Sequence, residues 1–215
     1  MHIIMQGPDC HKTFGLTLYR FYKGNFNAVY YDSREFMTPD LIGSDISRIL
    51  DKNIGATQKL VILCIGSDRS TGDCLGPLIG YKLAQLISPS DDVAVFGTLS
   101  HPVHAVNLLE TINRIHRIYN DPFIIAIDAS LGRRDHIGYI TLGSGALRPG
   151  LGVKKKLPEV GDIHITGIVN LSGGVDTVIL QTTRLATIMT LADAIASGLS
   201  KAIHSVTCQA SCPLL

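Results

Sequence analysis

The sequence lacks several features that would assign it to a common class of protein. It has no tryptophan, which excludes nothing by itself, and only 17% of its 215 residues are charged, with a formal net charge of +1. Such a balanced charge gives no field that would draw the chain to nucleic acid or to a membrane surface, so we expect neither partner. No apolar run approaches the roughly 18 residues of a membrane-spanning helix.

Cysteine is scarce and odd in number. The five cysteines include Cys64, which lies in an apolar run, and Cys208 and Cys212, which lack the two-residue spacing of zinc or redox pairs. An odd count with a buried thiol favours a reducing compartment over a secreted disulfide framework. Because the first residues lack a basic start followed by a long apolar run, no signal peptide is indicated and we expect a cytoplasmic protein.

Common nucleotide-binding and nucleophile signatures are also missing. The loop at 66–76 has neither the Gly-Lys-Ser/Thr ending of a P-loop nor the Gly-x-Gly-x-x-Gly fingerprint. The Gly143-Ser144-Gly145 segment is not the Gly-x-Ser-x-Gly elbow of serine hydrolases. We therefore expect no cofactor.

What the sequence does contain is apolar runs that alternate with amphipathic segments, within a composition that is 46% hydrophobic. The expected strands are 60–65, 93–96, 123–128, 138–142 and 163–169, and the expected helices are 39–52, 77–87, about 102–115 and 176–204. This alternation predicts an α/β fold whose sheet is covered on both faces. Residues 18–22 and 28–31 fit either short strands or packed loops. The expected organisation is an extension (1–37), one domain (38–205) and a tail (206–215).

Single residues are expected to define the helix ends and buried faces. Thr38 is expected to cap the first helix, Pro102 to begin the third, and Gly198 to interrupt the last. The expected buried face of the third helix is Val106, Leu108, Leu109, Ile112 and Ile115; that of the last is Leu185, Ile188, Met189, Leu191, Ala192 and Ile195.

Two acids follow two of the apolar runs. Asp73 lies in the polar loop after 60–65, and Asp128 directly follows 123–127. If both strands are parallel, the two acids open onto the same edge of the sheet, where ligands bind in open α/β folds. Two nearby carboxyls cannot both ionise easily, so one would hold a proton while the other acts as a base on water. The alternative is that each aspartate caps a helix or makes a turn.

His101, His104 and Cys74 offer other chemistry. The two histidines are three residues apart at the expected start of a helix and would share one face, but a metal site needs a third ligand, which Asp73 or Asp128 would have to supply. The alternative is a pair of surface or capping histidines. Cys74 is more simply a packing residue, because no base that would activate its thiol is evident.

The polar loop carries a resemblance to a known family. The segment Cys64–Leu78, with the sequence CIGSDRSTGDCLGPL, resembles the signature of the bacterial sporulation protein YyaC family, whose members are named as spore proteases. Segments 97–108 and 156–170 fit the same pattern, and the resemblance extends over about 58–200. That family is in turn similar to the germination protease, an endopeptidase that degrades small acid-soluble spore proteins.

The resemblance implies an aspartic-type endopeptidase that acts on a protein or peptide, with a spore protein as one expected substrate, in the spore or forespore. It places the catalytic carboxyls on Asp73 and Asp128. The residues that it implies as supporting the site or binding substrate are Asp68, Arg69, Ser70, His101, His104 and Arg148. One departure is Gly72, where the germination protease has proline before its aspartate.

A more distant resemblance is to the hydrogenase maturation peptidases. It implies a three-layer α/β/α sandwich with a mostly parallel central sheet and, as an alternative site, a metal held by Asp73, Asp128 and His101. The histidine of that family would fall within 145–155, where this sequence has none. A second alternative is a non-catalytic binding protein that keeps the fold. The apolar composition and these fold relatives are consistent with a homo-oligomer.

Overall fold

The computed structural model describes residues 19–23, 26–55, 57–88, 91–149, 157–173 and 175–210. Seven strands form one sheet: β1 (Tyr19–Lys23), β2 (Phe26–Asp32), β3 (Leu60–Cys64), β4 (Val93–Phe96), β5 (Phe123–Gly132), β6 (Tyr139–Ser144) and β7 (Ile163–Leu171). The helices are α1 (Thr38–Asn53), α2 (Leu75–Leu86), α3 (Leu108–Ile118), α4 (Asp176–Gln181) and α5 (Leu185–Ala210). The short 3₁₀ segments Gly72–Cys74 and Arg134–His136 accompany them.

The strands lie in the order β1-β2-β6-β7-β5-β3-β4. From β7 to β4 all neighbours are parallel, whereas β6 is antiparallel to β7, β2 to β6 and β1 to β2. Five of the seven strands therefore run in one direction, which confirms the expected α/β fold with a mostly parallel sheet. The two aromatic-rich segments near the N-terminus are strands, so the sheet extends beyond the domain boundary expected at residue 38.

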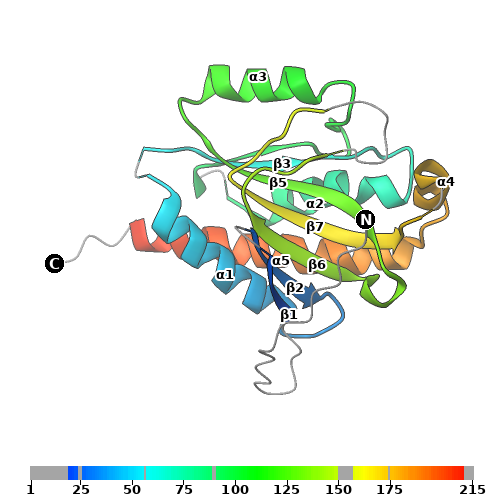
Figure 1. Cartoon of the computed structure of the whole chain (residues 1–215). Helices are drawn as coiled ribbons and strands as arrows, with labels where there is room; N and C mark the ends of the chain where they lie inside the picture. The colour runs from blue at the N-terminus through cyan, green and yellow to red at the C-terminus, as the bar shows by residue number, and fades with distance from the viewer. Residues whose placement is uncertain are drawn as a thin grey trace.

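Helices cover both faces of this sheet (Figure 1). Helices α1, α2 and α5 pack on one face and α3 lies on the other, which confirms the three-layer α/β/α arrangement. Side chains alternate along each strand, so β3 and β5 supply both cores. The first core receives Ile62, Cys64, Ile125 and Ile127 from these strands, and the second receives Val61, Leu63, Ile124 and Ala126.

The starts of two helices differ from the expectation. Thr38 does not cap α1, because its hydroxyl donates to the carbonyl oxygen of Asp32 at 2.5 Å and so ties the helix to the end of β2. Pro102 does not begin α3, which starts only at Leu108. The intervening turns are held by Asn107, whose Nδ2 donates to the carbonyl oxygen of Pro102 (3.0 Å) and whose Oδ1 accepts the N–H of His104 (2.8 Å).

The expected buried faces are partly wrong. In α3, Leu108 and Ile115 are fully buried, but Leu109 is 59% exposed, and Val106 lies before the helix and is 84% exposed. The expected helix over 176–204 is divided by residues 182–184 into α4 and α5, which leaves Leu185 and Met189 exposed at the start of α5. The other four residues expected to be buried there, Ile188, Leu191, Ala192 and Ile195, are buried.

Gly198 does not interrupt α5; it is the point where α5 meets α1. A Cβ at this position would lie 2.9 Å from Cγ2 of Ile42 and 3.1 Å from the carbonyl oxygen of Pro39. The bare backbone of Gly198 therefore lets the two helices approach closely.

We expect Gly198→Leu to destabilise the fold by about 1–3 kcal/mol, because overpacking a well-filled contact forces side chains or backbone to shift. Urea unfolding followed by circular dichroism measures this change. Ser205→Leu, on an exposed position of the same helix, is the matched control and should change stability little. Equal effects of the two leucines would contradict the packing argument.

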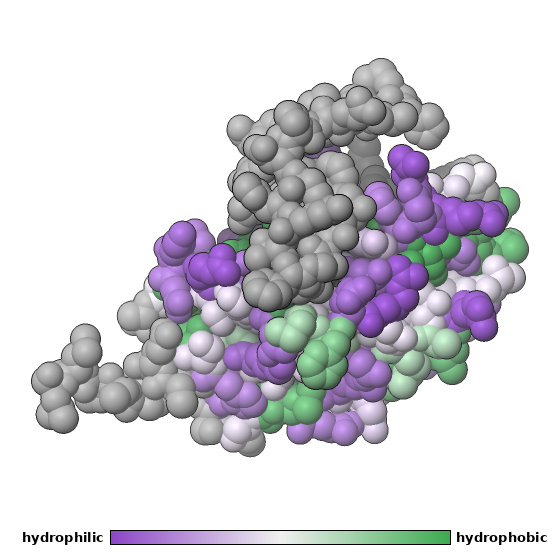
Figure 2. Space-filling model, turned by 90° about the horizontal axis from the view of Figure 1, so that it is seen from below, coloured by the Kyte–Doolittle hydropathy of each residue, from purple (hydrophilic) through white to green (hydrophobic). Residues whose placement is uncertain are grey.

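The described part of the surface is mixed in polarity on the face that Figure 2 presents, where hydrophilic and hydrophobic residues are interspersed. Among the described residues, none of the helices combines the length and the apolarity that crossing a bilayer requires.

Candidate functional site

Asp73 lies in a tight 3₁₀ turn, Gly72–Cys74, between β3 and α2; we call it the Asp73 turn. Backbone hydrogen bonds join this turn to the loop that directly follows β3. The N–H of Ser67 donates to the carbonyl oxygen of Asp73 (3.0 Å), and the N–H of Asp73 donates to the carbonyl oxygen of Ser70 (3.1 Å). Gly66 has φ +144, and a Cβ there would overlap the carbonyl oxygen of Asp73, so only glycine fits this approach.

Asp128 lies within β5 and not at its end, because the strand continues to Gly132 beyond the boundary expected from the sequence. It shares a sheet face with Ala126, the face that α3 covers. Its direct neighbour in β7 is Thr166, and its Oδ1 accepts the N–H of Ala129 at 2.8 Å. This backbone hydrogen bond orients the carboxyl on a strand that pairs with β3 and β7 inside the sheet.

The two carboxyls interact electrostatically. Burial, followed by the negative charge of Asp73, raises the pKa of Asp128 to about 8. Burial also raises the pKa of Asp73, although the backbone N–H of Ser67 and the imidazole of His104 oppose this rise. Because the pKa of Asp128 lies above neutrality, the coupled pair holds a proton at pH 7.

Among the expected supporting residues, His104 lies near enough to Asp73 to influence its pKa. The N–H of Val106 donates to Nδ1 of His104 at 3.3 Å, so in the neutral imidazole the proton lies on Nε2. His101 is exposed, and neither histidine lies on a helix, since α3 begins at Leu108. The expectation that the two histidines share a helical face is therefore wrong.

The other expected residues divide between the Asp73 loop and more distant positions. Asp68 and Arg69 are exposed in the loop. The hydroxyl oxygen of Ser70 is buried without a hydrogen-bond partner among the described residues. Arg148 is exposed and its Nε pairs with Oε1 of Glu159 at 2.9 Å. Cys74 donates its thiol proton to the carbonyl oxygen of Thr71 (3.0 Å), and burial and nearby acids raise its pKa, as befits a packing thiol.

The alternative metal site requires three ligands that lie close together. Among the described residues, no three histidine, cysteine, aspartate or glutamate side chains gather closely enough to hold a metal ion. The set Asp73, Asp128 and His101 is consequently not assembled as a ligand cluster in this arrangement. We therefore derive no chemical step through a metal.

A cluster of three hydroxyl side chains lies beside Asp128 and was not predicted from the sequence. The Oγ1 atoms of Thr141 (β6) and Thr166 (β7) are 2.7 Å apart, and Ser130 Oγ donates to Thr166 Oγ1 at 3.2 Å. The three residues come from three strands, so only the strand register brings them together. No local motif in the sequence marks them.

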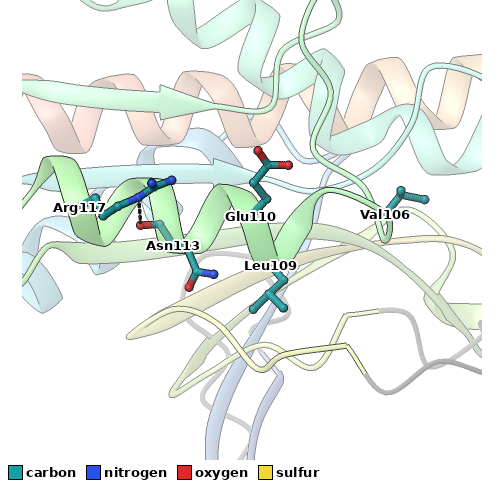
Figure 3. A pocket seen from close by; sticks show the side chains of 5 residues that line it. All are labelled: Val106, Leu109, Glu110, Asn113 and Arg117. Carbon is teal, nitrogen blue, oxygen red and sulfur yellow. Dashed lines mark hydrogen bonds between the residues drawn. The ribbon is translucent and has the colours of Figure 1, made fainter.

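A surface hollow of about 570 Å³ lies along α3. It is lined by Val106, Leu109, Glu110, Asn113 and Arg117. Figure 3 shows Leu109 and Asn113 on one side of the helix and Glu110 on the other, and the Nε of Arg117 donates to the carbonyl oxygen of Asn113 (3.4 Å). The hollow contains neither Asp73 nor Asp128, so it adds nothing to their chemistry.

We expect Ser70→Ala to leave the free energy of unfolding unchanged or to raise it slightly. A buried hydroxyl without a partner costs about 1–3 kcal/mol, so its removal relieves a penalty. Ser33→Ala is the matched comparison, because Ser33 is buried and donates to the carbonyl oxygen of Gly138 at 2.6 Å; its loss should cost about 1 kcal/mol. Urea titrations of both variants decide, and a clear loss of stability in Ser70→Ala would show that its hydroxyl is paired.

Comparisons with known proteins identify the family of this chain. A relative from Bacillus subtilis (strain 168), named "Uncharacterized protein YyaC", is 51% identical over 157 residues, which cover 72% of this chain and 76% of the relative. Among solved structures, the [NiFe] hydrogenase maturation protease HycI from Thermococcus kodakarensis KOD1 matches 70% of this chain and 98% of its own, with a TM-score of 0.41 and 16% identity. A family profile matches residues 35–198, and the chain belongs to that family, described as protein of unknown function DUF1256.

Proposed function

We propose that this protein is an endopeptidase that hydrolyses peptide bonds with the Asp73–Asp128 pair. The observation that carries the proposal is that two partly buried carboxyls lie just past the end of β3 and interact electrostatically, with the pKa of both raised and that of Asp128 above neutrality. Titratable pairs whose environments push their pKa values apart are typical of acid–base catalysis. The sequence resemblance to the germination protease supports the same two residues.

In the proposed mechanism, Asp73 is the base and Asp128 the acid. The Asp73 carboxylate accepts a proton from a water molecule while the water oxygen attacks the scissile carbonyl carbon. Asp128 donates its proton to the carbonyl oxygen, which gives a neutral gem-diol. When the C–N bond breaks, Asp73 passes its proton to the leaving amine, and a hydroxyl of the diol returns a proton to Asp128. Both carboxyls end in their starting states.

The substrate in this proposal is a protein or peptide, and the site of action is the cytoplasm of the spore or forespore. The resemblance of the Cys64–Leu78 segment to spore proteases supports this assignment. The proposed supporting residues in the loop are Asp68, Arg69 and Ser70, with His104 next to Asp73.

The test is cleavage of a library of unstructured peptides by the full chain in H₂¹⁸O, with the products identified by mass spectrometry. We expect new termini whose carboxyl carries one ¹⁸O atom from solvent. The double variant Asp73→Asn/Asp128→Asn is the control for contaminating proteases. Equal product from the variant and the wild type would refute the proposal, and peptide binding without any product would identify a binding protein that keeps the fold.

Chelators are expected to leave the activity unchanged, because Asp73 activates the water directly. Cleavage is measured before and after incubation with EDTA and removal of the chelator. A loss that added Zn²⁺ or Mn²⁺ restores would contradict the two-carboxyl mechanism.

A further inference from the structure

Helix α4 lies on the Asp73 turn. A Cβ at Gly72 would be 2.7 Å from Cδ2 of Leu180 and 2.8 Å from Oγ1 of Thr183, both shorter than real Cβ contacts allow. Gly72 and Thr183 are both buried. The residue before Asp73 is therefore in direct contact with the end of α4, with no room for a side chain between them.

Asn170, near the end of β7, holds α4 in this place. Its Nδ2 donates to the carbonyl oxygen of Ile179 (3.0 Å) and to Oγ1 of Thr183 (3.1 Å), while its Oδ1 accepts the N–H of Leu171 (2.8 Å). The Thr183 hydroxyl in turn donates to the carbonyl oxygen of Ile179 at 2.9 Å. These bonds fix both side chains in one orientation, because each accepts and donates at once.

A helix as short as α4 has little stability of its own. It has six residues, and isolated helices shorter than about 12 residues are marginal in water. Its position therefore depends on its anchors, which include Asn170 from β7, the packing of Leu180 against the core and the contact of Leu180 and Thr183 with Gly72.

We propose that Asn170 and Thr183 are positioning residues for Asp73: they hold α4 against Gly72 and so set the distance between the Asp73 and Asp128 carboxyls. The inference rests on the proposed function for its catalytic meaning. Asp128 belongs to β5, which pairs with β3 and β7 inside the sheet, whereas Asp73 is held by a turn whose outer side is covered by α4. If α4 moves outward, the turn loses this outer contact and keeps only its own backbone hydrogen bonds, so Asp73 can shift while Asp128 stays in place.

The position of a catalytic group matters at this scale, since a shift of about 1 Å can cost on the order of 100-fold in rate. We expect Thr183→Val, which keeps the shape but loses the hydroxyl, to lower kcat about 10–100-fold with little change in KM. Thr183→Ser should restore most of the rate, because the hydroxyl returns. Thr190→Val is the matched control: Thr190 makes a similar bond to the carbonyl oxygen of Ala186 (3.0 Å), within α5 and not in the segment that follows α4.

A second measurement does not need activity. Carboxyl ¹³C NMR titration of Asp128 reports how close the Asp73 charge lies, and we expect its pKa to fall in Thr183→Val and in the uncharged Asn170→Leu and to return in Thr183→Ser. Gly72→Ala is a further variant that leaves the side chains of Asn170 and Thr183 intact and inserts a methyl group between the turn and α4; we expect it to shift the pKa of Asp128 as well. These three variants keep the test open if one of them fails to fold.

The outcomes separate the positioning role from the proposed function. If the wild type cleaves no peptide but the Asp128 titration moves as expected, the positioning holds and the peptidase proposal fails. If the variants lose stability while both kcat and the Asp128 titration stay as in the wild type, Asn170 and Thr183 are merely structural and the inference is overturned.

Discussion

Asparagine in place of either Asp73 or Asp128 is expected to lower the rate of peptide hydrolysis by about 10²–10⁴-fold, the usual contribution of one general acid or base. Asp73→Asn removes the group that accepts the proton of water, and Asp128→Asn removes the proton that the carbonyl oxygen receives. Because the two act as a unit, the double variant should be little worse than either single one. Initial rates on a peptide found in the library screen measure this.

The matched control is Asp51→Asn, which removes an exposed acid near the end of α1 and should keep the activity. Circular dichroism and thermal unfolding of each variant exclude loss of fold as the cause. Full activity in Asp73→Asn or in Asp128→Asn would remove that residue from the proposed chemistry.

The second large effect is on stability. Asp128→Asn is expected to stabilise the protein above pH 8 by on the order of 2–4 kcal/mol. Each unit of pKa difference corresponds to about 1.4 kcal/mol, and the pKa of Asp128 rises from 3.8 to about 8 on folding; because the side chain is not fully buried and is coupled to Asp73, we expect a value below the full product. The asparagine keeps the shape of the side chain and never ionises.

The sign follows from proton linkage. Between pH 3.8 and about 8, the folded state keeps the Asp128 proton that the unfolded state has lost, so wild-type stability falls as the pH rises through this window. The raised pKa of Asp73 acts in the same direction. Urea unfolding of the wild type and Asp128→Asn at pH 4.5 and pH 8.5 should show a gap that widens with pH. A gap independent of pH would contradict the buried, protonated carboxyl.

Much of the fold could be predicted because the buried strands are almost wholly apolar. The run 60–65 and the start of β5 gave the parallel centre of the sheet directly, and the alternation of strands with helices gave the layers. The helix starts were predicted less well. Asn107 builds turns where Pro102 predicted a helix, and the hydroxyl of Thr38 found a tertiary partner in place of its own helix.

The position of the acids was predictable in part. Two acids that follow parallel strands are expected at one edge of a sheet. The direct pairing of β3 with β5, although β4 comes between them in the sequence, is a property of the whole topology. The contact of Thr183 with Gly72 is equally non-local, because it joins the segment after α4 to the Asp73 turn, which lies far away in the sequence. Periodicity and capping rules describe local structure and carry no information on such contacts.

The strand order has a consequence for folding during synthesis. Synthesis delivers β3, α2 and β4 before β5, yet β5 inserts on the other side of β3 from β4. Long-range pairing of this kind is slow compared with local folding, and a nascent chain folds from its N-terminus as it emerges. A half-made chain thus carries the Asp73 turn without its partner acid. On the proposed mechanism, a partial chain without Asp128 has no peptidase activity. It therefore does not cleave other chains that are still being synthesised.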